Sequence, residues 1–149
     1  MKQLYLILLV IIANVTQQSI AQNSKVDSLF GIFNTKSQAD TIRFKAIHAI
    51  INMYIYNNPD TALVLIKQEL KFAESMPEVT GKKWIANSLN VSGVAFMNKG
   101  DYPKALENYE KAVKLFEEIG NKRGMGNIYN NMEVFISIRL IILKHWSVT

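Results

Sequence analysis

Residues 100–107 read GDYPKALE, and this stretch decides how the rest of the 149-residue chain is interpreted. Glycine is favoured directly after the last turn of a helix, so Gly100 is expected to end one. Asp101 is placed to cap the helix that follows, and Pro103 falls in its first turn, where proline is tolerated. The stretch therefore predicts a tight turn between two antiparallel helices.

Apolar residues recur at steps of three and four on both sides of this turn, as expected of helices with one buried face. Before it they are Ile85, Leu89, Gly93 and Phe96, and after it Ala105, Tyr109, Ala112, Val113, Phe116 and Ile119, with Gly120 as the next stop. Beyond residue 22 the pattern lacks the alternation with period two that indicates strands. The sequence therefore predicts an all-α fold of antiparallel helix-turn-helix units.

One helical hairpin cannot bury its apolar face alone, so it needs neighbours of the same kind. A shift of forty residues pairs residues 86–94, ANSLNVSGV, with residues 126–134, GNIYNNMEV, and matches two asparagines and a valine. In the other direction residues 57–75 lie over the second helix, with Ala62 on Ala105 and Ile66 on Tyr109. We therefore expect a degenerate copy before the best unit and half of another copy after it.

The best unit, residues 86–118, resembles a tetratricopeptide repeat. The residues that carry the resemblance are Leu89, Gly93, Phe96, Gly100, Asp101, Tyr102, Ala105, Tyr109 and Ala112. Ser92 departs from the family, which has a large apolar residue there, and the step of forty is longer than the family's usual 34 or so. The resemblance covers about residues 38–134. It implies a right-handed superhelical stack in which Gly93 and Ala105 mark the closest approach of paired helices.

The first 21 residues have the order of a secretory signal peptide. Lys2 precedes an apolar run, and small residues stand at positions 19 and 21, so cleavage is expected after Ala21. An uncleaved membrane anchor is the alternative, but the run is shorter than the roughly 20 residues that span a bilayer. We expect export to a bacterial periplasm or exterior, where a chain without cysteine depends on helix packing instead of disulfides.

These features divide the chain into six segments. They are a signal peptide at 1–21, an N-terminal capping helix at 22–37, a degenerate repeat at 38–79, a complete repeat at 80–120, the first helix of a third repeat at 121–134, and an aberrant tail at 135–149. The tail is almost wholly apolar, whereas the terminal caps of helical repeats present a polar outer face.

The tail has a second interpretation in its coding sequence. When residues 135–147 are written in permitted codons and read two bases on, they give YINQADYPKALE, whose last seven letters repeat residues 101–107. We therefore hypothesise that a frameshift, either real or introduced in sequencing, interrupts a longer array. The codons of the gene decide this, because other codons do not yield the string.

Composition and motifs argue against nucleic-acid binding, metal binding and catalysis. The formal charge is +5 for the whole chain but +2 over residues 22–134, where 14 Lys and Arg face 12 Asp and Glu. Such a small excess predicts no strong attraction to phosphate. No cysteine accompanies His48 and His145, so His48 is interpreted as a packed or edge residue. Gly124 and Gly126 follow no strand and lack the lysine of a phosphate loop. We predict no enzyme, cofactor or metal site.

The remaining candidate site is the concave face that the resemblance places on the first helices of the units. Its expected residues are Asn87, Asn90, Val94, Met97, Asn98, Asn127, Asn130 and Asn131. An amide both donates and accepts hydrogen bonds, so a row of them suits the backbone of an extended peptide without regard to charge. The alternative is that asparagine is simply common on solvated helices.

The function predicted from these features is an exported protein-protein interaction scaffold with an unidentified protein or peptide partner. It would meet a membrane only through its signal segment or a lost downstream part. The alternative is the N-terminal sensor fragment of a larger bacterial signalling protein that has lost a kinase, cyclase or transcription-regulator output. An output domain in the shifted frame downstream would support the sensor, and an early stop would support the scaffold.

Overall fold

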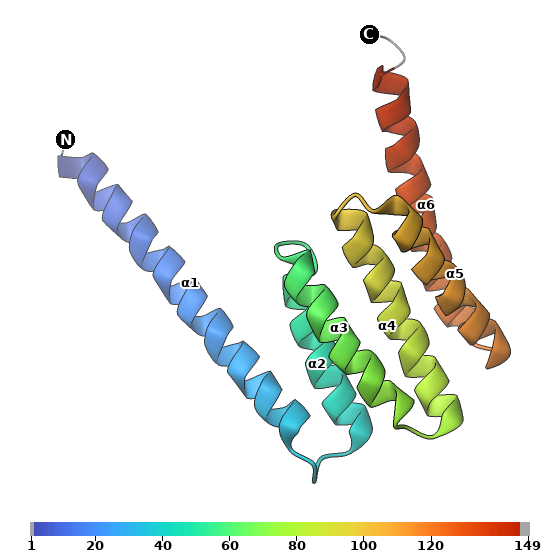
Figure 1. Ribbon diagram of the computed structural model, residues 1–149. Coiled ribbons are helices and arrows are strands. Elements are labelled where there is room, and N and C mark those ends of the chain that lie inside the picture. The colour runs from blue at the N-terminus through green and yellow to red at the C-terminus, as the bar shows by residue number, and fades with distance from the viewer. Residues whose placement is uncertain (1, 147–149) are drawn as a thin grey trace. The chain divides into compact units, whose positions relative to one another are not determined.

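In the computed structural model, residues 2–146 form six helices and no strand (Figure 1). The structure describes these residues and the side chains of residues 10–18, 20–134, 136 and 137. The helices are α1 (Lys2–Asn34), α2 (Asp40–Tyr54), α3 (Pro59–Glu74), α4 (Glu78–Asn98), α5 (Tyr102–Glu118) and α6 (Lys122–Trp146). The prediction of an all-α protein is confirmed for this part of the chain.

The chain divides into two compact units, and the boundary falls inside α2, between Ala46 and Ile47. In the first unit Arg43 ties the start of α2 to the end of α1. Its Nε donates to the backbone carbonyl of Phe33 at 2.9 Å, and its guanidinium lies 5.8 Å from the centre of the Phe33 ring. The same guanidinium pairs with Asp40 at 3.1 Å. These contacts hold the turn between the two helices.

The described part of the predicted leader and most of the predicted capping helix form one continuous helix, α1, of 33 residues. The capping helix was expected to reach residue 37, but α1 ends at Asn34 and residues 35–37 belong to the turn before α2. Five of the large apolar side chains of α1 are more than half exposed, namely Val10, Ile11, Ile12, Val15 and Ile20. Among the described residues no helix has the length and apolar character that a bilayer span requires. At the other end, the predicted aberrant tail continues α6 to Trp146, while its side chains at 135 and from 138 onward lie outside the described ones.

In the second unit, α4 packs against both α3 and α5, and α6 packs against α5 and also touches α4 (Figure 1). The centre of this packing is an almost fully buried cluster of three alanines, two aromatic residues and an isoleucine: Ala86, Ala105, Tyr109, Ala112, Phe116 and Ile128. The end of α2 joins the unit through His48, which contacts α3, and through Ile55, which contacts α4.

The turn at residues 100–107 is built as the sequence predicts. Gly100 has a φ of 76°, a left-handed conformation that glycine adopts without steric cost, and it lies directly after α4. The Asp101 amide then closes the helix by donating to the Phe96 carbonyl at 2.9 Å. The Asp101 side chain accepts from the Lys104 amide, with proline in the first turn of α5. Gly120, with a φ of 67°, ends α5 in the same way.

The predicted close approach of α4 and α5 is confirmed at Gly93. A Cβ added to this glycine would lie 2.5 Å from Cε1 of Tyr109, well inside ordinary contact distance. Tyr109 is 1% exposed, so its ring fills the space that the missing side chain leaves. Ala105 is buried beside it in the same cluster.

The helices α3 and α5 bury equivalent positions at a step of 43 residues. The pairs are Ala62 and Ala105, Ile66 and Tyr109, Glu69 and Ala112, and Ala73 and Phe116. Both helices are also capped alike, because the side chains of Asn58 and Asp101 each accept from the backbone amide three residues on. This is the alignment in which Ala62 falls on Ala105.

The helices α4 and α6 each pack a glycine against the preceding helix, and these two contacts are also related by 43 residues. A Cβ on Gly81 would lie 2.9 Å from the Ala73 carbonyl oxygen, and one on Gly124 would lie 2.7 Å from the Phe116 ring. Gly81 and Gly124 are 43 residues apart, as are Ala73 and Phe116. The packing register therefore lies three residues beyond the step of forty suggested by the asparagine pattern. The reason is that close glycine contacts, and not exposed amides, fix how helices pack.

Candidate functional site

The candidate site residues lie on α4 and α6. Asn87, Asn90, Val94 and Met97 recur at steps of three or four along one side of α4, and Asn98 follows Met97 directly. Asn127, Asn130 and Asn131 lie on α6, which touches α4. We call the five residues Asn87, Asn90, Asn127, Asn130 and Asn131 the amide face.

One hydrogen bond joins the two helices within the amide face. Nδ2 of Asn131 donates to Oδ1 of Asn90 at 2.9 Å, and both side chains are half-buried. The structure therefore brings together two of the predicted residues that are 41 positions apart in the chain. This bond orients both amides, because donating and accepting ends of an asparagine side chain are not interchangeable.

Much hydrogen-bonding capacity on this face is unused by the protein. Asn127 and Asn130 are exposed and Asn87 is half-buried. Among the described residues, none of these three side chains is engaged in an intramolecular hydrogen bond. An asparagine amide has two donors and an oxygen that accepts twice, and a peptide backbone offers one donor and one acceptor per residue. The face is therefore chemically matched to a peptide backbone.

Three of the predicted site residues have structural roles instead. Val94 and Met97 are half-buried and pack against the core cluster, so they stabilise α4 more than they line a surface. Nδ2 of Asn98 donates to the backbone carbonyl of Ile55 at 2.8 Å. This bond satisfies a carbonyl group at the end of α2, where no intrahelical partner exists. Asn98 therefore ties α2 to α4.

The amide face contains no titratable side chain, and the resolved pKa shifts belong to other places. Hydrogen bonds from Lys82 to Glu78 and Glu118 raise the pKa of Lys82 above its usual range. The hydrogen bond from Lys104 lowers the pKa of Asp101, and burial raises the pKa of Tyr109 to about 12. Recognition at the amide face would therefore depend on hydrogen bonds and not on ion pairs.

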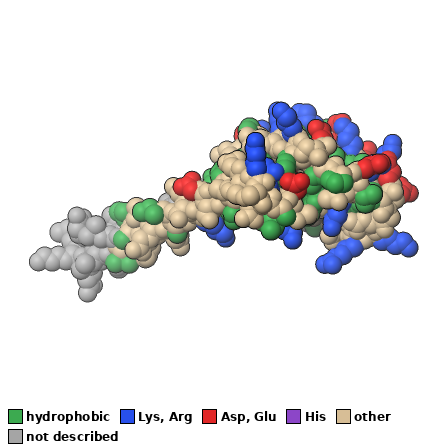
Figure 2. Space-filling model, turned by 90° about the horizontal axis from the view of Figure 1, so that it is seen from below, with side chains coloured by type: hydrophobic (Ala, Val, Ile, Leu, Met, Phe, Trp, Pro, Cys, Tyr) green, Lys and Arg blue, Asp and Glu red, His purple; other side chains and the backbone are tan. Residues whose placement is uncertain are grey.

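Charged side chains of both signs occur together on the side of the molecule shown in Figure 2. Some charged side chains of the described residues pair along one helix, as Lys111 does with Glu107 at 2.6 Å. Others join neighbouring helices, as Lys82 of α4 does with Glu118 of α5 at 3.3 Å. This mixture agrees with the small net charge of the chain from residue 22 to residue 134.

A buried acid–base pair was missed by sequence reasoning. His48 is half-buried, as expected of a packed or edge residue, but its Nδ1 lies 2.7 Å from Oε1 of Glu69, whose side chain is 0% exposed. Oε2 of Glu69 has no hydrogen-bond partner among the described residues. The signal was present, because Glu69 stands on the buried stripe of α3 where α5 has Ala112. Within the described residues no group of three metal-ligating side chains is assembled.

No protein-family model, no curated protein and no solved structure matches this chain.

Proposed function

We propose that this chain is an exported, non-enzymatic protein-interaction scaffold of tetratricopeptide-like helical repeats that binds an extended peptide across α4 and α6. The observation that carries the proposal is the hydrogen bond between Asn90 and Asn131. It links α4 and α6, which in this proposal are the first helices of successive repeats, so that amides on both helices belong to one surface. The common step of 43 residues in burial and capping supports the repeat interpretation.

The spacing of the two helices sets how a peptide would lie on this surface. Packed helices stand about 8–10 Å apart, and an extended chain advances about 3.3 Å per residue. A peptide that crosses both helices would therefore contact α4 and α6 through residues about three positions apart. The peptide backbone would form hydrogen bonds with the asparagine amides, so the surface would discriminate only weakly between peptides of different sequence.

The test uses a displayed library of random twelve-residue peptides (a length of about four helix-to-helix spacings). Peptides enriched on the wild-type chain are synthesised, and their dissociation constants are measured against a triple variant, Asn87→Ala, Asn127→Ala and Asn130→Ala. We expect binding to weaken by about tenfold or more, because each lost hydrogen bond contributes about 1 kcal/mol.

The matched control is Asn108→Ala on α5, because Nδ2 of Asn108 donates to the Lys104 carbonyl within its own helix. This variant should bind the peptides as the wild type does. Since the face is uncharged, the dissociation constant should also change little between low salt and salt at about 0.5 M, where exposed ion pairs are screened. Equal affinity of the triple variant and the wild type would refute the proposal.

A further inference from the structure

The helix α6 carries an apolar stripe that is only partly covered. Its members are Met125, Tyr129, Met132 and Ile136, and we call them the α6 seam. Tyr129 is 51% exposed and Ile136 is 52% exposed, while the two methionines are half-buried. The steps along the seam are four, three and four residues, which is the spacing of the contact positions in a coiled coil.

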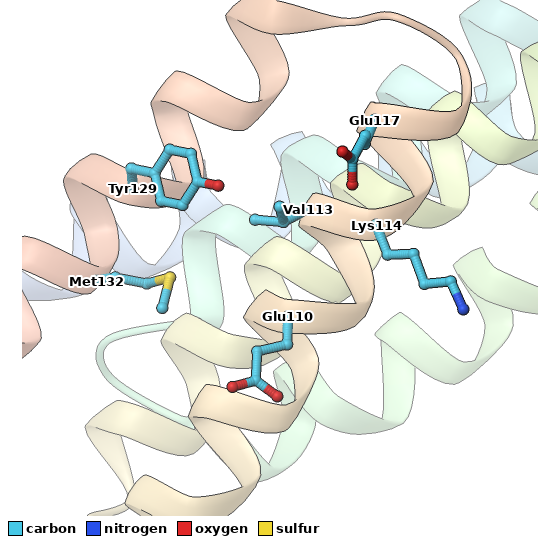
Figure 3. Close-up of a pocket in the computed structure, with 6 residues that line it drawn as sticks. All are labelled: Glu110, Val113, Lys114, Glu117, Tyr129 and Met132. Atoms are coloured by element: carbon cyan, nitrogen blue, oxygen red, sulfur yellow. The ribbon is translucent and has the colours of Figure 1, made fainter.

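The seam continues the interface between α5 and α6. Tyr129 and Met132 from α6 point toward Val113 from α5 across a groove of about 460 Å³ (Figure 3). Glu110 and Glu117 lie at the edge of this groove, and Lys114 points away from it (Figure 3). Val113, Met132 and the Tyr129 ring therefore give the groove an apolar lining, with two carboxylates at its edge.

The helix α4 has a side equivalent to the α6 seam, and on α4 this side is covered by α5. At the step of 43 residues, Tyr129, Met132 and Ile136 correspond to Ala86, Leu89 and Gly93. Ala86 belongs to the core cluster that contains Tyr109 of α5, Leu89 packs against that cluster, and Gly93 directly faces the Tyr109 ring. The seam is therefore the side of α6 on which a further helix would be expected to pack.

A helix like α5 does not fit this side of α6. At Gly93 a single added carbon would already lie 2.5 Å from the Tyr109 ring, and α6 has Ile136 at that position. Similarly, Tyr129 stands where α4 has the fully buried Ala86. A helix that covers the seam must therefore stand farther away and meet large side chains with large side chains. That packing is typical of helices that both carry a heptad seam.

We propose that two copies of this chain associate through their α6 seams, which form a two-helix contact related by a twofold axis. A twofold contact joins the same surface of both copies, so a self-complementary stripe on one helix supplies both halves. The groove with Val113 adds apolar area beside the seam in each copy. This association is independent of the amide face, which lies on another side of α6.

Because the chain has no cysteine, single cysteine variants report the contact directly. Tyr129→Cys, Met132→Cys and Ile136→Cys are introduced one at a time into the full chain, oxidised mildly, and run on non-reducing gels. A disulfide requires Cα atoms within about 4.4–6.8 Å, so a covalent dimer at one or more of these positions shows that the seams meet.

Two control variants locate the association. Asn127→Cys is exposed on another side of α6, and Ile20→Cys replaces the 68% exposed Ile20 of α1. We expect both to remain monomeric on the gel while a seam variant dimerises. Cross-linking at Asn127 or Ile20 as fast as at the seam would overturn the proposal, because the copies would then associate elsewhere or without order.

Sedimentation without cross-linking gives an independent measure. The double variant Tyr129→Lys with Ile136→Lys should weaken the dimer by about 100-fold or more, because it places charges in an apolar contact. The matched control is Val64→Lys with Val79→Lys, which replaces two exposed apolar residues of α3 and α4, and it should leave the dimer unchanged. Circular dichroism confirms that both variants fold. A wild-type chain that stays monomeric at about 0.1 mM, where even weak specific dimers form, would overturn the proposal.

Discussion

Replacing Gly93 by alanine tests the packing on which the whole second unit depends. In most helices this change is favourable, because alanine has a helix propensity about 1 kcal/mol better than glycine. At Gly93, however, the new Cβ would lie 2.5, 2.7 and 2.9 Å from three carbon atoms of the Tyr109 ring. Since Tyr109 is 1% exposed and surrounded by the core cluster, the ring has little space into which it can move.

The expected magnitude follows from these two opposing effects. Forcing an extra carbon into a well-packed core costs about 1–3 kcal/mol, and more where the neighbour cannot shift. Three contacts below 3.0 Å place Gly93 at or above the upper end of that range. After subtraction of the gain in propensity, we expect the free energy of unfolding to fall by about 2 kcal/mol. For the second compact unit, residues 47–149, a loss of about 2 kcal/mol corresponds to a decrease in Tm of roughly 8–15 °C.

Urea unfolding followed by circular dichroism measures the change, with Gly126→Ala as the matched control. Gly126 is exposed on α6, and an added Cβ would have no neighbour within 4 Å, so this variant should gain up to about 1 kcal/mol. The variant Gly93→Ala combined with Tyr109→Leu should also lose less than the two single changes predict together. A Gly93→Ala protein as stable as the Gly126→Ala protein would refute the close packing of α4 on α5.

Three further predictions concern buried groups and the end of the chain. Tyr109→Phe removes a buried hydroxyl that has no hydrogen-bond partner among the described residues, so the free energy of unfolding should rise by up to about 1 kcal/mol at neutral pH. Because burial raises the pKa of Tyr109 to about 12 from the ordinary 10.0, its ionisation costs no stability below pH 10, where the hydroxyl is protonated in both states. Above pH 10 the unfolded chain ionises first, so the wild type should lose about 2 kcal/mol by pH 12 relative to the Phe variant in parallel urea titrations. Equal losses in the two proteins would contradict this. His48→Ala leaves the Glu69 carboxylate buried without its partner and should cost about 3 kcal/mol, and adding Glu69→Leu should restore most of the loss in a double-mutant cycle. Additive effects would show that the pair is not coupled. Trimming the chain after Asn131 removes Met132 and Ile136 and should give a more soluble, monomeric protein by sedimentation, whereas stronger aggregation would identify the removed segment as a cap.

The turn and the close contact of α4 with α5 were predictable because they depend on residues that are close in sequence. Gly100, Asp101 and proline at 103 each have a local preference that agrees with the others, and local agreement of this kind specifies a turn strongly. Gly93 was informative for a related reason. A glycine inside a helical stripe is costly unless something uses the space, and Tyr109 lies on the matching stripe of the next helix.

The packing register of α6 was less predictable from the amino-acid sequence. The alignment at forty residues matched Asn87 with Asn127, and exposed amides tolerate small shifts without a change in energy. The buried contacts are less tolerant, and they place Gly124 against Phe116 at the step of 43 residues. Register is therefore read more safely from small buried residues than from repeated polar ones.

The candidate site was predictable as a set of positions but not as a set of contacts. A stripe of asparagines at helical spacing indicates a shared side of a helix, and the hydrogen bond between Asn90 and Asn131 joins one such residue from each of two helices. The bond from Asn98 to the Ile55 carbonyl depends on where α2 ends relative to α4, and no local preference encodes that distance. The pairing of His48 with Glu69 depends in the same way on how α2 packs on α3.

The difference between α4 and α6 follows from what each helix has beside it. A glycine in a helix interior costs about 1 kcal/mol, and at Gly93 the burial of an aromatic ring offsets that cost, since a fully buried aromatic side chain contributes about 2 kcal/mol or more. On α6, Tyr129 and Ile136 are about half exposed, so the described residues do not enclose them as Tyr109 encloses Gly93. Glycine there would lose apolar surface and helix propensity, and alanine would lose apolar surface, without a buried ring to offset the loss. Large residues at these positions are therefore those expected of a helix whose partner stands farther away and carries side chains of similar size.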